Sequence, residues 1–300
     1  MRVYQKPLMV HTSFAREPYR ALEILRSGGI PVFDSSDRTA QAISALMHFA
    51  GYRAKTSRMA YRPQDAMVPP SVGEILTKAR AEGRKNLLET ECREILARYG
   101  ITLPEALLAG DQDEAVSMAA KIGFPAAMKV VSPDILHKSD VGGVKLNLRS
   151  EREARDAFQV IMENAVKITT PDRVQGVLIS HMAQKGQECI IGMTRDRVFG
   201  PVVMFGLGGI FVEVLRDVSL RLAPLSEIDI EEMIREIKGY PVLTGIRGEK
   251  PKDVQALKDV LEKISRLVVD ISELAEVDLN PVIVHEKGLS IVDSRMILKG

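Results

Sequence analysis

A histidine in a polar loop is the main nucleophile candidate in this sequence. His137 lies in the segment 134–144 (DILHKSDVGGV), beside a cation and a carboxylate and ahead of two glycines that permit positive φ and close backbone approach. A neutral imidazole can attack phosphorus when a neighbouring carboxylate orients the ring. The alternative is a solvated loop histidine without a chemical role.

A lysine stands among apolar residues where a strand is expected to end. Lys129 belongs to the run 128–132 (MKVVS), and an unpaired ammonium inside a buried strand would lose its proton or cost several kcal/mol. Its partner is either a phosphate group or a nearby carboxylate, unless the side chain reaches solvent at a sheet edge. We include Ser132, which ends the same run, among the candidate cofactor contacts.

A set of oxygen-bearing side chains lies near the C-terminus. Glu276, Asp278 and Asn280 alternate with apolar residues, so a strand would place them on one face, and a turn at 286–288 would bring Asp293 of the next strand to that face. Mg²⁺ typically takes one or two carboxylates together with phosphates and waters. The same alternation also describes an ordinary half-exposed strand.

A glycine run, Gly206-Leu207-Gly208-Gly209, follows an apolar strand. It matches neither common phosphate-loop pattern, because no G-x-x-x-x-G-K-[ST] is present and Phe211 takes the third glycine position of G-x-G-x-x-G. The run is either a tight turn between strands or a flexible backbone nest that covers phosphates.

These groups require a framework of mixed or antiparallel sheets with helices on one face, an α+β architecture in two lobes. The hydrophobic pattern predicts helices at 71–82, 86–99, 112–122, 150–165, 227–238 and 251–271, and strands at 105–109, 126–131, 144–148, 174–181, 187–194, 201–205, 275–284 and 289–293. Short turns join several of these strands, which disfavours a doubly wound parallel sheet.

The N-terminal part follows a different pattern. Strands at 7–10 and 30–33 alternate with helices at 16–27 and 38–50, a β-α-β-α fragment too small for a strong core of its own. We interpret residues 1–53 as the end of a larger α/β domain, residues 54–70 as an exposed basic linker, and residues 71–300 as the second domain.

Composition limits the possible partners and compartment. The net charge of +1 gives no overall field for nucleic acid or an acidic membrane surface, and no apolar run approaches the roughly 20 residues that span a bilayer. The two cysteines, Cys92 and Cys189, form no CxxC pair, so we expect neither a disulfide framework nor a thiolate metal site. A soluble protein of the reducing cytoplasm fits best.

Four segments in order, ILHKSDVGGV, FGPVVMFGLGGIFVEVLRD, RLAPL and EVDLNPVIV, resemble the nucleotide-binding subunit of the ADP-forming acyl-CoA synthetases, relatives of succinyl-CoA synthetase. The resemblance covers about residues 71–300. It implies a two-lobed ATP-grasp fold that uses ATP or ADP with Mg²⁺. Residues 1–53 resemble the end of the flavodoxin-like ligase domain that precedes the ATP-grasp domain in fused members.

The resemblance also implies roles for individual residues. Lys129 would contact the nucleotide, Asn280 and Asp293 would bind Mg²⁺, and His137 would carry phosphate on a mobile segment. We keep Asp278 as a further metal candidate. Three weaker groups of candidates follow. Glu188 would contact the nucleotide near the hinge between the lobes, and Gly206, Gly208 and Gly209 would form the backbone nest. Glu213 and Arg216 would be polar groups that close on the phosphates or on His137.

The mechanism that the resemblance implies is a relay. Acyl-CoA and phosphate give an acyl phosphate, a histidine outside this sequence takes the phosphoryl group, and His137 passes it to Mg-ADP. The CoA-binding domain and the first phosphohistidine domain are not in the sequence, so we expect CoA-binding, α-type domains or an α-type subunit as partner, with no CoA bound here. A homo-oligomer is also possible.

Two other functions are compatible with the same residues. An ATP-grasp carboxylate ligase would make an acyl phosphate directly and would keep its turnover without His137. A regulatory ATP-grasp module would bind nucleotide without transferring phosphate.

Overall fold

The structure, a computed structural model, describes residues 7–12, 20–56, 67–209, 216–246 and 248–300. It divides the chain into two compact units, Met1–Met59 and Ala60–Gly300. The boundary lies within the segment 54–70. That the first unit is the end of a CoA-ligase-type domain stays a prediction.

The first unit has the expected β-α-β-α order. It contains β1 (Val10–His11), α1 (Arg20–Ser27), β2 (Val32–Phe33) and α2 (Ser36–Thr56), with β1 and β2 paired in parallel. Helix α2 continues to Thr56, so the prediction that this helix ends at residue 50 was wrong. The reason is that residues 51–56 contain no proline, and the helix can continue through them.

The second unit is built around a six-stranded sheet in which every described pairing is antiparallel. The strand order is β11-β10-β7-β8-β9, and β12 pairs with β10. The strands are β7 (Gln187–Asp196), β8 (Gly200–Leu207), β9 (Val218–Leu222), β10 (Leu274–Val284), β11 (Leu289–Ile291) and β12 (Ser294–Leu298).

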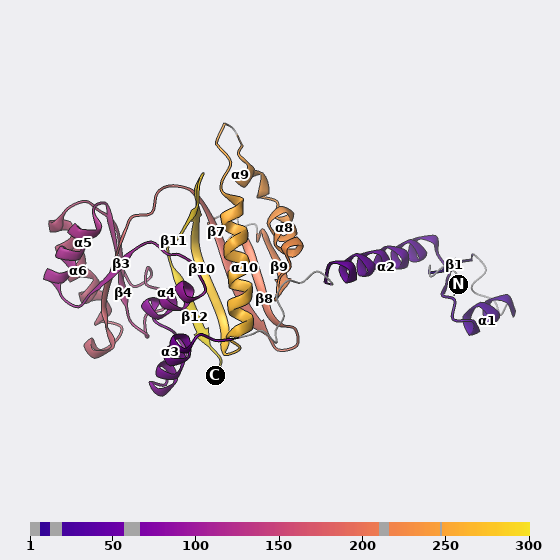
Figure 1. Ribbon diagram of the computed structural model, residues 1–300, viewed down its shortest axis with the longest axis horizontal. Coiled ribbons are helices and arrows are strands. Elements are labelled where there is room, and N and C mark those ends of the chain that lie inside the picture. The colour runs from indigo at the N-terminus through magenta and orange to yellow at the C-terminus, as the bar shows by residue number, and fades with distance from the viewer. Residues whose placement is uncertain (1–6, 13–19, 57–66, 210–215, 247) are drawn as a thin grey trace. The chain divides into compact units, whose positions relative to one another are not determined.

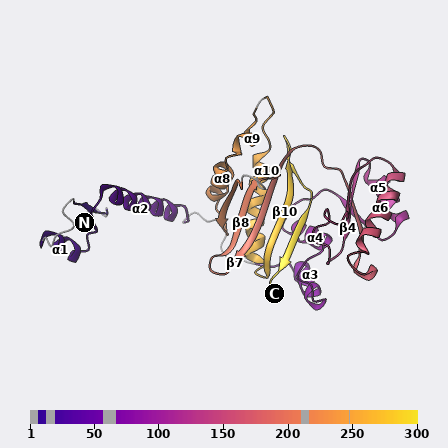
Figure 2. The ribbon, with the colours of Figure 1, turned by 180° about the vertical axis from the view of Figure 1, so that it is seen from behind.

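Helices α8 (Glu227–Glu236) and α10 (Val254–Asp270) cover one face of this sheet, as Figures 1 and 2 show from opposite sides. Helix α10 buries the side chains at positions 257, 261, 264 and 268, a helical period, in a core that also contains Phe205. Asp253 caps the N-terminus of this helix, because its side chain accepts a hydrogen bond from the backbone N–H of Ala256.

A smaller sheet of four strands has the order β3-β6-β4-β5, and its described pairings are also antiparallel. Its elements are β3 (Ala106–Ala109), β4 (Ala126–Val131), β5 (Val144–Leu148) and β6 (Gly176–His181), with α5 (Gln112–Ile122) and α6 (Glu151–Ala165). The two helices lie on the side away from the six-stranded sheet (Figure 1). Every residue of β4 is buried, and that strand carries Lys129.

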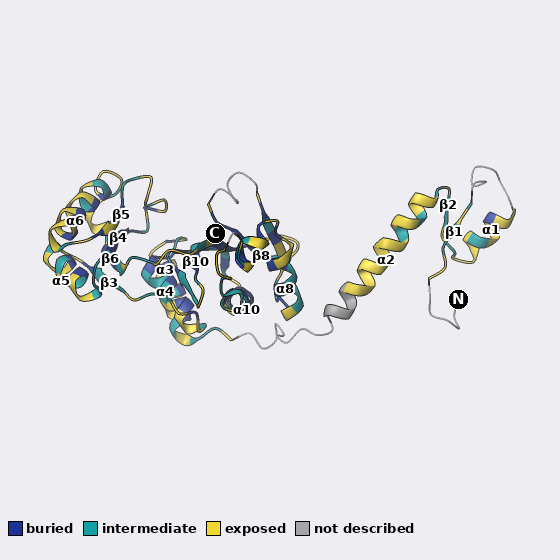
Figure 3. Cartoon of the chain, turned by 90° about the horizontal axis from the view of Figure 1, so that it is seen from above, coloured by how far each residue is buried: buried dark blue, intermediate teal, exposed yellow. Residues whose placement is uncertain are grey.

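Two helices precede the small sheet. Helices α3 (Pro70–Ala81) and α4 (Glu89–Arg98) pack together, and α4 contacts β12. Figure 3 shows buried residues on both helices. Helix α4 begins three residues later than the predicted 86, because residues 86 and 87 pair with β12: the N–H of Leu87 donates to the carbonyl of Met296 at 3.0 Å. Short helices η2 (Pro171–Arg173) and α9 (Tyr240–Thr244) complete the described elements.

The α+β prediction is confirmed, but several local predictions were wrong. Strand β9 was missed because its polar residue faces the core and its leucines face outward, the reverse of the usual strand pattern. Ser219 is buried, while Leu220 and Leu222 are about half exposed. Gly206 lies inside β8, paired with Ile190 and Val218, and is not part of a turn. Asp293 lies between β11 and β12, where the chain leaves one edge of β10 and returns to pair with it again.

No helix among the described residues is both long and apolar enough to span a bilayer. Both cysteines are buried free thiols. Burial raises the pKa of Cys189 to about 12, so this thiol is protonated and unreactive near neutral pH.

Candidate functional site

The buried lysine of β4 has partners outside its own sheet. The ammonium of Lys129 donates to the carbonyl of Val292 at 2.6 Å and lies 3.4 Å from both Glu89 Oε1 and Asp293 Oδ1. The structure therefore pairs this lysine with carboxylates, one of the three alternatives that the sequence left open. A phosphate contact stays a prediction.

Glu89 is a member of this cluster that the sequence did not indicate. It is the first residue of α4, and its side chain is 3% exposed. Lys138 donates to Glu89 Oε2 at 2.5 Å. Burial raises the pKa of Glu89, against the opposing effect of Lys129. A glutamate in the first turn of a helix is so common that its type and position gave no signal of a buried role.

Asp293 lies between the same two lysines. Lys138 donates to Asp293 Oδ1 at 2.9 Å, the oxygen that also faces Lys129. Burial alone would raise the pKa of Asp293, but the charges of Lys129 and Lys138 outweigh it and hold the pKa at about 2. The pKa of Lys138 is raised because the two carboxylates outweigh the effect of burial. We call Lys129, Lys138, Glu89 and Asp293 the charge cluster.

His137 is exposed on the segment of residues 132–143, which we call the His137 segment. The segment is fixed near both ends. At its start, Asp134 accepts hydrogen bonds from Arg173 at 2.7 Å and from Thr169 at 2.5 Å. At its end, Gly142 has a φ of 66° and Gly143 is packed so closely on Val130 that an added Cβ would lie 2.6 Å from Cγ1.

A cavity of about 590 Å³, which we call the central cavity, lies beside the charge cluster. Its walls come from residues 86–89, β4, the His137 segment, β5, β10 and residues 292–295. It brings together six of the residues selected from the sequence: Lys129, Ser132, His137, Asp278, Asn280 and Asp293. The sequence placed these residues in four separate segments.

Asp278 is also tied to a cation. Arg295 hydrogen-bonds to Glu276 and lies 3.8 Å from Asp278 Oδ2. Burial raises the pKa of Asp278, against the opposing effect of Arg295. A second cavity of about 410 Å³, lined by β7 to β10, shares Asp278 with the central cavity. Asp278 thus lies where the two cavities meet.

The donor set of the central cavity fits a hard cation. Asn280 and Asp293 both line it, one offering an amide oxygen and the other a carboxylate that is charged at neutral pH. Ser294 Oγ, in the same wall, is buried without a hydrogen-bond partner among the described residues. Those residues contain no group of three or more His, Cys, Asp or Glu that could hold a metal by itself. Such a cation would therefore need phosphate and water oxygens as well.

A separate group forms at the start of β7. The N–H of Gly208 donates to the carbonyl of Glu188 at 2.8 Å, and a Cβ on Gly208 would lie 3.1 Å from the Cβ of Glu188. Gly209 has a φ of 61°, which favours glycine. The structure therefore brings the last two glycines of the run and Glu188 together. Arg216 is exposed, with a φ of 49°. Glu213 lies outside the described residues.

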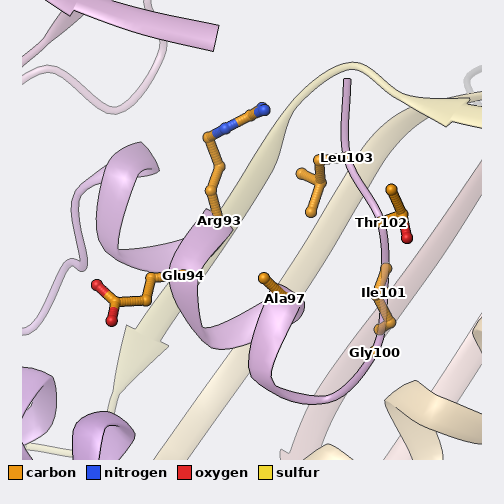
Figure 4. Close-up of a pocket in the computed structure, with 7 residues that line it drawn as sticks. All are labelled: Arg93, Glu94, Ala97, Gly100, Ile101, Thr102 and Leu103. Carbon is orange, nitrogen blue, oxygen red and sulfur yellow. The ribbon is translucent and has the colours of Figure 1, made fainter. Parts of the chain in front are cut away.

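A smaller cavity of about 380 Å³ lies at the end of α4, lined by Arg93, Leu103 and their neighbours (Figure 4). Arg93 uses its guanidinium to donate to the carbonyl of Pro104, and burial lowers its pKa. None of the residues selected from the sequence lines this cavity. We assign it no role in the site.

Known proteins resemble this chain over most of its second unit. Residues 78–298 match the ATP-grasp domain family. The chain is 51% identical over 225 residues to the acetate–CoA ligase [ADP-forming] I subunit beta of Pyrococcus furiosus, an alignment that covers 75% of this chain and 97% of that subunit. It is 39% identical over 289 residues to the 4-hydroxybutyrate–CoA ligase [ADP-forming] of Nitrosopumilus maritimus, covering 95% of this chain but only 40% of that protein.

A solved structure is similar to this chain in both fold and sequence. Acetyl-coenzyme A synthetase 1 of Ca. Korarchaeum cryptofilum, in complex with coenzyme A and Mg-AMPPCP and with its phosphohistidine segment pointing towards the nucleotide-binding site, superposes with a TM-score of 0.67 at 50% identity. The match covers 76% of this chain and 100% of the matched one. This chain therefore belongs to the ATP-grasp family, as the β-subunit portion of the ADP-forming acid–CoA ligases.

Proposed function

We propose that this chain moves a phosphoryl group between His137 and Mg-ADP or Mg-ATP, as the nucleotide-binding part of an ADP-forming acyl-CoA synthetase. The observation that carries the proposal is that His137 lines the same cavity as Lys129, Asn280 and Asp293. A histidine in the same cavity as a cation and hard oxygen ligands has the parts that phosphoryl transfer to a nucleotide needs.

The transfer is a displacement at phosphorus. In the direction of ATP synthesis, the bond between phosphorus and the imidazole nitrogen of His137 breaks, and a terminal β-phosphate oxygen of ADP forms the new bond. The imidazole keeps the electron pair and is left neutral. In the reverse direction the neutral imidazole attacks the γ-phosphorus of ATP, and ADP leaves.

Lys129, Asn280 and Asp293 would orient the nucleotide for this step. The ammonium of Lys129 would face a phosphate oxygen, because it already lies 3.4 Å from the carboxylate that would hold the metal. Asn280 and Asp293 would hold Mg²⁺, with Asp278 reaching it directly or through water. When bound, Mg²⁺ neutralises charge on the phosphates. The relative with Mg-AMPPCP and a phosphohistidine segment supports this assignment.

The remaining selected residues have proposed roles around the nucleotide. Glu188, packed on Gly208 and Gly209, would contact it near the hinge. The N–H of Gly208 is taken by the carbonyl of Glu188, so the N–H of Gly209 would be the one that faces the phosphates. Ser132, buried in the wall of the central cavity, would donate to it as well. Glu213 and Arg216 would close on the phosphates or on His137. The placement of Gly206 inside β8 gives it a structural part in this arrangement.

The complete reaction would involve CoA-binding, α-type domains or an α-type subunit, which would supply the acyl-phosphate chemistry and the first phosphohistidine. Helix α2 offers a surface for such a partner, since Ile43, Met47 and Phe49 expose 45%, 70% and 58% of their area. The β-subunit relatives support this division of labour. The buried free thiols are compatible with the cytoplasm as its location.

The test is labelling with γ-³²P-ATP and Mg²⁺. We expect acid-labile, base-stable label on the wild-type chain and none on His137→Ala. His181→Ala is a matched control, because His181 is an exposed histidine at the end of β6 and does not line the central cavity. Equal labelling of His137→Ala and the wild type would refute the proposal. ATP turnover with acid that survives in His137→Ala would favour a carboxylate ligase instead.

A further inference from the structure

The residue after the candidate phosphoryl carrier ties the carrier's segment to the candidate metal ligand. Lys138 lies next to His137 in sequence, and its ammonium bridges Glu89 Oε2 at 2.5 Å and Asp293 Oδ1 at 2.9 Å. We propose that Lys138 is a latch that holds the His137 segment, and that Mg²⁺-nucleotide opens the latch by taking Asp293. This inference rests on the proposed function.

The anchors of the segment define what the latch can control. Asp134 is held by Arg173 and Thr169, and the carbonyl of Gly142 accepts from Asn164 at 3.3 Å. Between them, residues 135–141 carry one ion-paired side chain among those described, Lys138. His137 lies three positions after the first anchor, a length of chain that spans roughly 10 Å when extended. The carbonyl of Lys138 also accepts from the N–H of Gly143 at 2.7 Å, and the side chain of Ile135 is buried. Among the side chains of residues 136–140, the ion pairs of Lys138 are the contacts whose release would free His137.

Burial makes the latch a defined contact. The side chain of Lys138 is 13% exposed and that of Glu89 is 3% exposed, so solvent does not replace their interaction easily. A charge-assisted hydrogen bond in such surroundings is short and oriented. An ion pair of the same length between an exposed lysine and an exposed carboxylate would contribute little to stability.

Metal binding and the latch compete for one carboxylate. Asp293 Oδ1 faces both Lys129 and Lys138, and a cation on this carboxylate would stand close to both ammonium groups. Like charges at such separations repel strongly away from bulk water. Lys129 is confined within β4 and keeps the carbonyl of Val292 as acceptor, whereas Lys138 sits on a segment that can move. Lys138 is therefore the ammonium group that moves away from Asp293 and Glu89, and Glu89 then pairs with Lys129 alone.

The consequence is an order of events. Without a loaded acceptor, the latch holds His137 at the central cavity. With Mg-ADP bound, the segment is free to leave, collect a phosphoryl group and return. Lys138 and Glu89 would thus be positioning residues, since they act through the placement of His137 and not on the phosphorus.

Hydrogen exchange of the full chain, measured by mass spectrometry, tests the latch without catalysis. We expect Mg-ADP to accelerate amide exchange in residues 135–141 about tenfold or more, as loss of a charge-assisted contact would, and ADP with EDTA to have no such effect. Lys138→Gln should exchange fast without any ligand. Lys138→Arg keeps the charge and should behave as the wild type.

Two further variants sharpen the result. Glu89→Gln weakens one side of the latch without removing a candidate metal ligand, and should also exchange faster. Lys145→Gln removes a lysine from β5 that does not line the central cavity, and should match the wild type. Lys138→Gln should also bind Mg²⁺ more tightly in the presence of ADP, because the competitor for Asp293 is gone.

The latch is wrong if Lys138→Gln and the wild type exchange alike without ligand, or if Mg-ADP slows exchange in residues 135–141 to the same extent in both. Failure of the latch is distinct from failure of the proposed function. Label on His137 with unchanged exchange would remove the latch alone. Ligand-dependent exchange with no label on His137 would keep the latch and remove phosphoryl transfer.

Discussion

The ammonium of Lys129 and the carbonyl oxygen of Val292 lie 2.6 Å apart, although 163 residues separate them in sequence. The contact joins β4 of the four-stranded sheet to the connection between β11 and β12 of the six-stranded sheet. It fixes Lys129 next to Asp293, the residue after its acceptor. A cation and a candidate metal ligand are therefore held together by the fold itself, which is the preorganisation that the proposed phosphoryl transfer would use.

Replacement of this lysine should weaken nucleotide binding. We expect Lys129→Gln to lower the affinity for ADP about tenfold or more, since a charge-assisted contact to phosphate is lost. Its stability should fall by less than the about 3–5 kcal/mol typical of a broken buried ion pair, because Glu89 keeps Lys138 as partner. Calorimetric titration and thermal unfolding measure the two effects. Unchanged ADP affinity would leave Lys129 a structural residue only.

The candidate metal ligands should act on cation binding in particular. Asp293→Asn and Asn280→Ala should each weaken Mn²⁺ binding to the ADP complex by about 10-fold or more, by analogy with the loss of groups around metal sites. Asp156→Asn, on an exposed face of α6, is the matched control. Electron paramagnetic resonance of free Mn²⁺ gives the affinities. Equal affinities in all variants would contradict the assignment.

The first anchor of the His137 segment should respond to pH. The hydrogen bond from Arg173, followed by that from Thr169, lowers the pKa of Asp134 to about 2. A depressed folded-state pKa contributes stability above the ordinary value of about 3.9, and this contribution is lost as the pH falls towards 2. The difference in unfolding free energy between wild type and Arg173→Gln should thus be constant above about pH 5 and shrink between about pH 4 and 2.

Carbon NMR of the Asp134 carboxyl measures the same effect directly. Its midpoint should rise in Arg173→Gln towards the ordinary value. An unaltered midpoint would mean that Arg173 does not hold this end of the segment.

The second anchor can be tested with a pair of glycines. A Cβ at Gly143 would lie 2.6 Å from Val130 Cγ1 and 3.0 Å from the carbonyl oxygen of Lys138, so Gly143→Ala should cost about 1–3 kcal/mol of stability. Gly73, inside α3, has open space around its Cβ position, so Gly73→Ala should add roughly 0.5–1 kcal/mol. Urea unfolding measures both changes. A Gly143→Ala variant as stable as the wild type would show that the contact relaxes easily.

Most elements of the second unit could be predicted from hydrophobic period, because their buried faces are apolar. The pattern failed where burial is inverted or interrupted. Strand β9 exposes Leu220 and Leu222 and buries Ser219, a pattern that does not predict a strand. The chain around Asp293 was assigned to one strand, whereas the structure breaks it into β11 and β12 on either side of that residue.

The site shows a similar division. Residue type and spacing selected Lys129, His137 and Asp293, because each is unusual in its surroundings. They could not select Glu89, since a glutamate at the start of a helix is ordinary until the fold brings Lys129, 40 residues away in sequence, to within 3.4 Å. The role of Lys138 likewise depends on a contact across 155 residues, which no local pattern contains.

A pulse and chase of the phosphorylated chain tests the central claim most directly. The wild-type chain is labelled with γ-³²P-ATP, freed of nucleotide, and given unlabelled ADP with Mg²⁺. The account predicts that label leaves His137 and appears in ATP in equal amount, and that neither happens when EDTA replaces Mg²⁺. Label that stays on the protein, or that appears as inorganic phosphate, would contradict transfer between His137 and Mg-ADP.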